Sequence, residues 1–209
     1  IQTNVKLVGN TIIDALKIAQ NTLHKNSPQL PFSFESISHK TIILLTCHRR
    51  EHWGQPMKDV FSAVLTILTN NPMTHVVFPV HLNPTIQQLS DNYFKKHPQV
   101  TLLKPLSYPE LIYVMTKSHI VLTDSGGIQE EAPSLNKPII VLRSVTERTE
   151  GVIHGTAKLV GTNKTKIIES TQELLNKPKN YSKMTMASEL YGDGQSAKRI
   201  LNTLEQYMR

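Results

Sequence analysis

The sequence predicts an α/β fold in which a doubly wound, Rossmann-like parallel sheet lies between layers of helices. Apolar runs of strand length alternate with segments of helical apolar spacing along most of the chain, and this alternation is typical of parallel α/β sheets. The runs are continuously apolar, as in TIILLTC at residues 41–47, which favours strands buried on both faces. Polar and glycine-rich segments follow these runs, as expected for a ligand site at the carboxyl edge of the sheet.

Each expected strand is a short apolar run that is partly β-branched. These strands cover residues 41–47, 75–81, 100–106, 119–124, 137–143 and 157–161. The expected helices show apolar residues three or four positions apart, and several begin at a capping residue or a proline. These helices cover residues 10–24, 57–68, 84–96, 108–118, 128–135, 164–176 and 195–208.

The length of 209 residues suffices for one large domain or two small ones with a proper core, and we expect a single domain over residues 1–209. A content of 39% hydrophobic and 19% charged residues is typical of a globular protein. The net charge of +7 suits an anionic, phosphate-bearing ligand. The lysines are scattered and aromatic residues are few, which argues against nucleic acid as a partner. No apolar run approaches the roughly 18 residues of a membrane helix, so we expect no membrane span.

The cysteine content and the first residue bear on the origin of the chain. The single cysteine, Cys47, fits a reducing cytoplasm and is interpreted as a small buried apolar residue rather than a nucleophile. The sequence starts at Ile1 rather than at methionine, so we expect a piece of a longer protein.

The stretch LTDSGGIQEEAPSL, residues 122–135, carries the sharpest functional signal. Gly126 and Gly127 lack a Cβ, so a ligand can approach the backbone closely. The free amides at 125–127, at the start of a helix, favour a phosphate, and Ser125 adds a hydroxyl. The structural alternative is that Ser125 only caps the helix and Glu130 only stabilises its first turn.

Glu131 lies four residues after Gly127 and therefore on the same helical face as the glycine turn. A carboxylate beside a phosphate site repels the phosphate unless it binds another group. The hydroxyls of a sugar suit it, because a carboxylate accepts two hydrogen bonds from a diol. Phosphate at the turn and ribose at Glu131 together indicate a nucleotide.

Along most of its length the sequence resembles the C-terminal half of the non-hydrolysing UDP-N-acetylglucosamine 2-epimerases. The resemblance rests on LVGNTIIDAL, CHRREHWG, PVHLNP, LTDSGGIQEEAPSLNKPIIVLR, TERTEGVIHGTAKLVGTN and YGDGQSAKRI. It implies the C-terminal, UDP-binding domain of a two-domain, glycosyltransferase-B-type architecture. The N-terminal domain, with its catalytic carboxylates and a phosphate-binding arginine, is then absent from this chain.

The resemblance also implies a reaction. The family interconverts UDP-N-acetylglucosamine and UDP-N-acetylmannosamine by eliminating and re-adding UDP, without a metal or redox cofactor. It is an isomerase activity that serves cell-surface polysaccharide biosynthesis, and we expect this half alone to bind UDP without turnover. We also expect a cytoplasmic homo-oligomer, with the N-terminal domain as partner in cis or as a separate chain.

The implied roles fall on positions that match the family motifs. His48 matches the active-site histidine, which contacts the leaving UDP or helps proton transfer. The UDP-binding positions are Leu106, Leu111, Ser125, Gly126, Gly127, Glu131 and Arg148. Leu106 and Leu111 lie where the family commonly has glutamine and phenylalanine around the uracil, and Glu131 matches the ribose-binding glutamate.

Two further positions, Arg49 and His81, match residues that help hold a second, regulatory UDP-N-acetylglucosamine in bacterial relatives. His52 departs from the family pattern, which usually has asparagine there. In the family the last helix, here at residues 190–209, crosses back to the first domain. We therefore expect this helix, with Ile200, Leu201 and Leu204 on its apolar face, to be displaced, mobile or used in oligomer contacts.

Two other hypotheses about the function of the chain stay open. One is a glycosyltransferase-like UDP-sugar-binding domain that transfers the sugar. The other is a non-catalytic half produced by a split or decayed gene. Transfer requires an acceptor and epimerisation does not, so product analysis with UDP-N-acetylglucosamine distinguishes the first of these from the epimerase.

Overall fold

The computed structural model describes residues 5–25, 27–186 and 189–208. In these residues six parallel strands form one sheet in the order β3-β2-β1-β4-β5-β6. The strands are β1 (Thr41–Thr46), β2 (Thr74–Pro79), β3 (Val100–Leu103), β4 (Ile120–Thr123), β5 (Ile139–Val141) and β6 (Ala157–Leu159). The prediction of a doubly wound, Rossmann-like parallel sheet is therefore confirmed.

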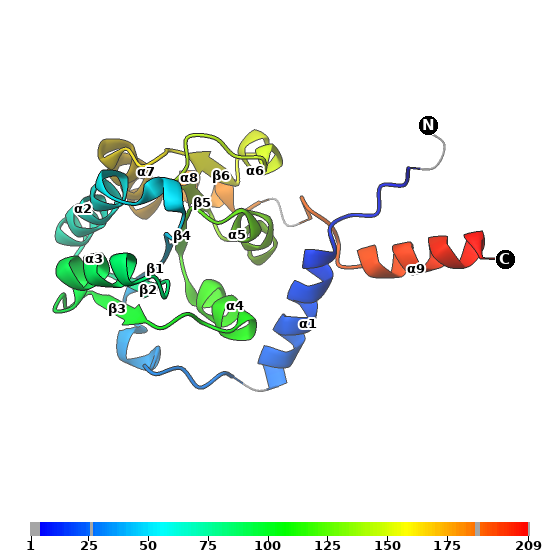
Figure 1. Ribbon diagram of the computed structural model, residues 1–209, viewed down its shortest axis with the longest axis horizontal. Helices are drawn as coiled ribbons and strands as arrows, with labels where there is room; N and C mark the ends of the chain where they lie inside the picture. The colour runs from blue at the N-terminus through cyan, green and yellow to red at the C-terminus, as the bar shows by residue number, and fades with distance from the viewer. Residues whose placement is uncertain (1–4, 26, 187–188, 209) are drawn as a thin grey trace.

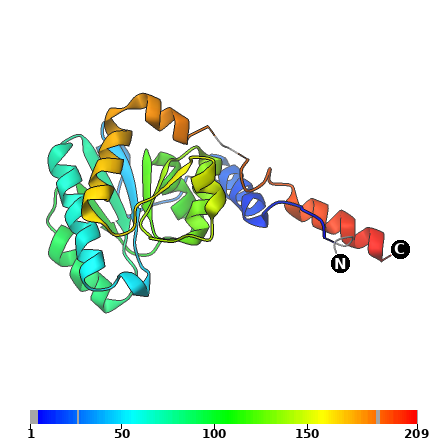
Figure 2. The ribbon, with the colours of Figure 1, turned by 90° about the horizontal axis from the view of Figure 1, so that it is seen from above.

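Helices alternate with the strands along the chain and lie on both sides of the sheet (Figures 1 and 2). They are α1 (Thr11–Lys25), α2 (Gln55–Asn70), α3 (Pro84–Phe94), α4 (Tyr108–Lys117), α5 (Gly126–Glu131), α6 (Thr149–Ile153), α7 (Lys164–Asn176), α8 (Pro178–Met184) and α9 (Ser196–Tyr207). Short 3-10 turns occur at Glu35–Ile37, Arg50–His52 and Ala132–Leu135. None of the described helices is long and apolar enough to cross a membrane.

The two faces of the sheet carry separate cores, because successive strand residues point to opposite sides. Ile43 and Leu45 of β1 pack into the cluster formed with α2, α3 and α7. Ile42 and Leu44 pack into the cluster formed with α1, α4 and α5. This double burial explains why the strand sequences are continuously apolar rather than alternating.

The direction of the strand order reverses between β1 and β4, which are adjacent in the sheet although β2 and β3 lie between them in sequence. Leu45 is in register with Leu122, and Thr46 with Thr123. The chain leaves these two strands in opposite directions, which opens a crevice at their carboxyl ends. The segments that follow β1 and β4, at residues 47–54 and 124–127, meet at this switch point.

Two helices were not expected from the sequence, α6 and α8. Both are short, with five and seven residues, so neither shows enough apolar periodicity to be recognised. The expected strand at 100–106 ends at Leu103, and residues 104–107 leave the sheet as a loop. That loop contributes to the candidate site described below.

The last helix, α9, does not pack on the sheet and extends away from the body of the domain (Figures 1 and 2). Its first turn is fixed to α1, because the Asp14 carboxylate accepts hydrogen bonds from the backbone N–H groups of Ser196 and Ala197 at 3.1 and 3.0 Å. Leu201 and Leu204 remain 56% and 52% exposed. The apolar face of α9 therefore stays largely exposed within the described part of the chain.

Candidate functional site

A cavity of about 250 Å³ lies at the carboxyl edge of the sheet, beside the switch point between β1 and β4. Its walls come from the segments that follow β1, β2, β3 and β4. Among the predicted site residues it brings together His48, His81, Leu106, Leu111, Ser125, Gly127 and Glu131. Thr46, Pro79, Val80, Pro105, Tyr108 and Ile128 complete the lining. One wall is therefore apolar, and the opposite wall carries the glycine turn and a carboxylate.

Glu131 is an acid in an apolar setting, with only 4% of its surface exposed. Burial raises the pKa of Glu131, the Glu130 charge raises it further, and the nearby Tyr108 hydroxyl lowers it in part. The Tyr108 hydroxyl is buried and has no hydrogen-bond partner among the described residues. Burial and the Glu131 charge raise the pKa of Tyr108, so the phenol keeps its proton. The Glu131 carboxylate and the Tyr108 hydroxyl thus lie side by side at the wall of the cavity.

The turn at residues 125–127 differs in one respect from the sequence-based expectation. The Ser125 N–H donates to the Thr123 hydroxyl at 3.0 Å, so this amide is not free for a ligand. Gly126 and Gly127 follow as the first residues of α5, where N–H groups have no acceptor within the helix. The free amides therefore begin at Gly126. The Ser125 side chain makes no capping hydrogen bond, which removes the alternative that this serine only caps the helix.

Neither Gly126 nor Gly127 is required by the fold itself. Neither has a positive φ, so backbone strain does not demand glycine here. A Cβ on Gly127 meets no atom within 4 Å, and a Cβ on Gly126 lies 3.5 Å from Cζ of Arg148. Gly127 therefore leaves open space over the turn, as close approach by a ligand requires, whereas Gly126 leaves room for the Arg148 guanidinium.

Arg148 belongs to the loop between β5 and α6 and reaches back to the glycine turn. Its side chain donates from Nε to Glu130 Oε1 at 2.7 Å. Its backbone N–H donates to the Thr146 hydroxyl, which donates to the Gln129 side chain at 2.7 Å. Glu130 is therefore not merely a helix-terminus acid, because it pairs with the arginine. Two successive residues of α5 hold the Arg148 loop against the turn.

His48 follows β1 and faces the cavity, with 43% of its side chain exposed. Its backbone N–H donates to Asp124 Oδ2 at 2.9 Å, and its Nδ1 lies 3.6 Å from Asp124 Oδ1. The same carboxylate accepts from the Arg49 backbone N–H and pairs with His52 Nδ1 at 3.1 Å. Asp124 is fully buried. Burial favours the neutral acid, but the hydrogen bonds from His52 and the loop backbone lower the pKa of Asp124 overall.

The two residues predicted for a regulatory site, Arg49 and His81, contact different parts of the structure. His81 lines the 250 Å³ cavity, where its ring lies 6.0 Å from the His48 ring. Arg49 does not line it; its Nε donates to the Asp124 carbonyl and its Nη1 to Glu51. A second nucleotide-sugar site formed by Arg49 and His81 stays a prediction.

Cys47, His52 and Asp124 form a buried group whose potential ligand atoms lie within 4.8 Å of one another. Burial and the Asp124 charge raise the pKa of the Cys47 thiol well above its usual range, so it resists becoming the thiolate that a metal needs. Structural zinc is held by four protein ligands and catalytic zinc by three plus an open position, whereas this group is closed and hydrogen-bonded to loop backbone. We assign no metal to it.

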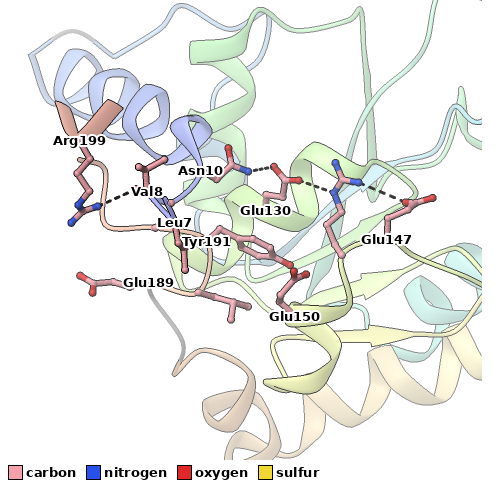
Figure 3. Close-up of a pocket in the computed structure, with 13 residues that line it drawn as sticks. Leu7, Val8, Asn10, Glu130, Glu147, Glu150, Glu189, Tyr191 and Arg199 are labelled. Atoms are coloured by element: carbon pink, nitrogen blue, oxygen red, sulfur yellow. Dashed lines mark hydrogen bonds and ion pairs between the residues drawn. The ribbon is translucent and has the colours of Figure 1, made fainter. Parts of the chain in front are cut away.

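A second, wider cavity of about 610 Å³ lies beside Glu130 of α5 (Figure 3), and Arg148 is among the residues that line it. It is lined by the chain entering α1, by α5 and α6, and by residues 189–192. Glu130, Glu150, Glu189 and Arg199 are among its charged residues. Of the predicted UDP-binding residues, Arg148 therefore lines this second cavity and not the 250 Å³ one, although its guanidinium approaches the Cβ position of Gly126.

Sequence reasoning missed two residues that organise this site, Tyr108 and Asp124. Tyr108 follows Ser107 at the start of α4, and its hydroxyl carries no local sequence signal. Asp124 stood in the quoted motif, but its partners His48, Arg49 and His52 lie more than 70 residues away in sequence. Only the adjacency of β1 and β4 in the sheet brings them together.

Comparison with known proteins decides the family. The protein-family model described as UDP-N-acetylglucosamine 2-epimerase matches residues 1–205 of the sequence. The chain belongs to this family. It is 43% identical to the UDP-N-acetylglucosamine 2-epimerase of Bacillus subtilis and 42% identical to that of Campylobacter jejuni, over 96% and 95% of its own length. It covers only 52% and 54% of those proteins, so it spans about half the length of the curated relatives it matches.

Solved structures of this epimerase family share the fold over nearly the whole chain. The S. aureus MnaA–UDP structure superposes with a TM-score of 0.91 at 39% identity, over 99% of this chain and 55% of that one. The UDP-GlcNAc 2-epimerase from Neisseria meningitidis bound to UDP-GlcNAc gives 0.87 at 38% identity, over 96% and 55%. The C-terminal domain of a group 1 glycosyl transferase from Francisella tularensis, at 15% identity and a TM-score of 0.60, shares the fold alone.

Proposed function

We propose that this chain supplies the UDP-binding half of a UDP-N-acetylglucosamine 2-epimerase. The observation that carries the proposal is the cavity beside the switch point, where a buried carboxylate, an exposed glycine turn and an apolar wall converge on one space. Membership of the epimerase family and the likeness to the S. aureus UDP complex support it. Different residues of the site are assigned to the uracil, the ribose and the diphosphate of UDP.

Each wall of the cavity suits one chemical group of UDP. Leu106 and Leu111 form an apolar surface for the uracil ring. Glu131 accepts hydrogen bonds from the two ribose hydroxyls, and Tyr108 is placed beside it. The amides of Gly126 and Gly127, the Ser125 hydroxyl and the Arg148 guanidinium bind the diphosphate.

The epimerase reaction proposed is elimination of UDP followed by its return to the other face of the sugar. In this scheme the departing diphosphate gains negative charge, which the glycine amides and Arg148 stabilise. His48, held through its backbone by Asp124, lies at the mouth of the cavity and contacts the diphosphate or moves a proton at the leaving oxygen. The acid and base groups at C2 of the sugar belong to the N-terminal domain, which completes the cleft. Homo-oligomerisation and a cytoplasmic role in polysaccharide synthesis stay predictions.

The test is titration of the 209-residue chain with UDP while its thermal unfolding is followed. Binding to the native state raises Tm with ligand concentration. We expect UDP to raise Tm for the wild type and to have little effect on Glu131→Ala. An unchanged Tm for the wild type at millimolar UDP contradicts the proposal.

Product analysis with UDP-N-acetylglucosamine then tests the chemistry. Adding the missing half in trans should yield UDP-N-acetylmannosamine without any acceptor. Sugar transfer to an acceptor, without epimer, would favour the glycosyltransferase alternative. Turnover by this chain alone would contradict the division of roles between the two halves.

A further inference from the structure

An acidic residue stands directly beside the proposed diphosphate site, where a carboxylate should weaken anion binding. Glu130 follows the glycine turn by three positions and is only 14% exposed. Coulomb repulsion between a carboxylate and a phosphate disfavours this arrangement. Another interaction must therefore outweigh the repulsion if the residue serves the site.

Both oxygens of the Glu130 carboxylate are occupied. Oε1 accepts from Arg148 Nε at 2.7 Å, and Oε2 accepts from Asn10 Nδ2 at 2.7 Å. Asn10 is itself fixed, because its Oδ1 accepts from the Ile12 N–H and its backbone N–H donates to the Tyr191 carbonyl at 2.8 Å. The three side chains form a chain of contacts from the entry into α1 to the glycine turn (Figure 3).

The geometry leaves both Nη groups of Arg148 without a hydrogen bond within the described part of the chain, and Nη1 makes only a longer ion pair of 3.8 Å with Glu147. Its Nε is bonded to Glu130, while the structure gives Nη1 and Nη2 no hydrogen bond among the described residues. Nη2 lies 3.8 Å from the Cβ position of Gly126. A guanidinium bonded through Nε still offers Nη donors to a phosphate in fork geometry.

The remaining acid near the guanidinium, Glu147, does not take this role. It lies 3.8 Å from Arg148 Nη1, beyond hydrogen-bond distance. Both its oxygens accept from Arg143, at 2.9 Å each. Glu147 is therefore engaged mainly by Arg143 and forms only a longer ion pair with Arg148, whereas Glu130 accepts the hydrogen bond that the Arg148 side chain donates within the described residues.

We propose that Glu130 is a positioning residue for diphosphate binding: it holds Arg148 through Nε so that Nη1 and Nη2 face the phosphates at the glycine turn, and Asn10 holds Glu130. This inference rests on the proposed function. A free arginine side chain loses rotamer entropy when it binds, which lowers affinity by about tenfold. Pre-ordering by Glu130 removes that loss, and its negative charge is neutralised by the arginine it holds.

The experiment compares the UDP dissociation constants of four forms of the chain by calorimetric titration: wild type, Glu130→Ala, Arg148→Ala and the double variant. We expect Glu130→Ala to raise the constant for UDP about tenfold. Because Glu130 acts through Arg148, the same change should cause no further loss of UDP affinity when Arg148 is already alanine, where removing the unneutralised carboxylate only relieves its repulsion of the phosphates. Additive losses, an unchanged constant or tighter binding by Glu130→Ala would each overturn the inference.

Two variants exclude a general structural effect. Glu130→Gln is nearly isosteric and keeps an acceptor for Arg148 Nε, so we expect an intermediate UDP affinity and the thermal stability of the wild type. A loss of UDP affinity as large as that of Glu130→Ala would contradict positioning by this hydrogen bond. Glu150→Ala removes a carboxylate from the same 610 Å³ cavity without touching Arg148, and should leave UDP affinity within about twofold.

Failure of the inference is distinguishable from failure of the proposed function. If the wild-type chain binds no UDP, the proposed function fails and the inference fails with it. If the wild type binds UDP and the cycle shows no coupling, only the positioning role fails. Uridine at millimolar concentration adds an internal check, because it lacks phosphates and its binding should not respond to Glu130→Ala.

Discussion

The Asp124 carboxylate at the end of β4 accepts a 2.9 Å hydrogen bond from the backbone N–H of His48 at the end of β1. A second bond of 2.9 Å comes from the Arg49 N–H. These bonds join the two strands at which the sheet reverses its order. A buried acid thus fixes the loop that carries the candidate active-site histidine.

We predict that Asp124→Asn lowers the free energy of unfolding by about 2 kcal/mol, because a charged acceptor loses several buried hydrogen bonds. The pKa of Asp124 is lowered in the folded state. Its carboxylate therefore stabilises the fold at pH values above the ordinary aspartate pKa, and this contribution is lost as the pH falls through the folded-state pKa. Urea unfolding of both forms at pH 7 and at lower pH should show a difference that shrinks on acidification.

The matched control for that experiment is Asp91→Asn on α3. Asp91 is 46% exposed and forms only a surface ion pair with Lys95, so its substitution should change unfolding by less than about 0.5 kcal/mol. If Asp124→Asn proves as mild as this control, the carboxylate does not secure the β1–β4 junction.

Gly127→Ala should separate stability from binding. A Cβ at Gly127 meets no atom within 4 Å, and alanine is favoured over glycine within a helix by roughly 0.5–1 kcal/mol. We therefore expect equal or higher thermal stability. The added methyl group covers the amides of the turn, so UDP affinity should fall at least about tenfold. Parallel unfolding and titration measurements test both; unchanged UDP affinity would mean that the phosphates do not approach this backbone.

The fold was predicted correctly from the sequence for the elements whose position is set by burial in the core. Continuous apolar strands such as residues 41–47 are fixed by packing on both faces, and such runs are visible in the sequence. The glycine turn and Glu131 were predicted as site residues from their local spacing, and Ser125, Gly127 and Glu131 line one cavity in the structure. Asp124 and Tyr108 were missed as site residues, since their roles depend on contacts between strands that are distant in sequence. The occupied amide of Ser125 depends on the Thr123 rotamer, which no sequence pattern specifies.

The apolar face of α9 gives a prediction about stability. Leu201 and Leu204 are 56% and 52% exposed and do not pack on the sheet. Replacing both with serine should change the free energy of unfolding by less than about 1 kcal/mol. Leu16→Ala on α1, which is 1% exposed, is the contrasting control and should lower it by about 2–5 kcal/mol. A large loss on changing α9 would show that this helix packs against the chain in solution.

Glu131→Gln should make the chain more stable and a poorer UDP binder. Burial raises the pKa of Glu131, so the fold favours the protonated acid. Its contribution to stability is fully present below the ordinary glutamate pKa and is lost as the pH rises through the folded-state pKa. At pH 7 the wild type therefore carries an unfavourable buried charge, which the neutral glutamine lacks. We expect Tm to rise by a few degrees at pH 7 in the variant, and this gain should vanish on acidification.

The same substitution should weaken UDP binding about tenfold at pH 7, because the carboxylate accepts from both ribose hydroxyls and the amide oxygen accepts less well. As the pH falls through the raised pKa of Glu131, wild-type affinity should approach that of the variant. Phosphate groups also take up a proton near about pH 6, but this affects both proteins equally and cancels in their ratio. A ratio of UDP affinities that stays constant with pH would show that the ionised Glu131 does not hold the nucleotide.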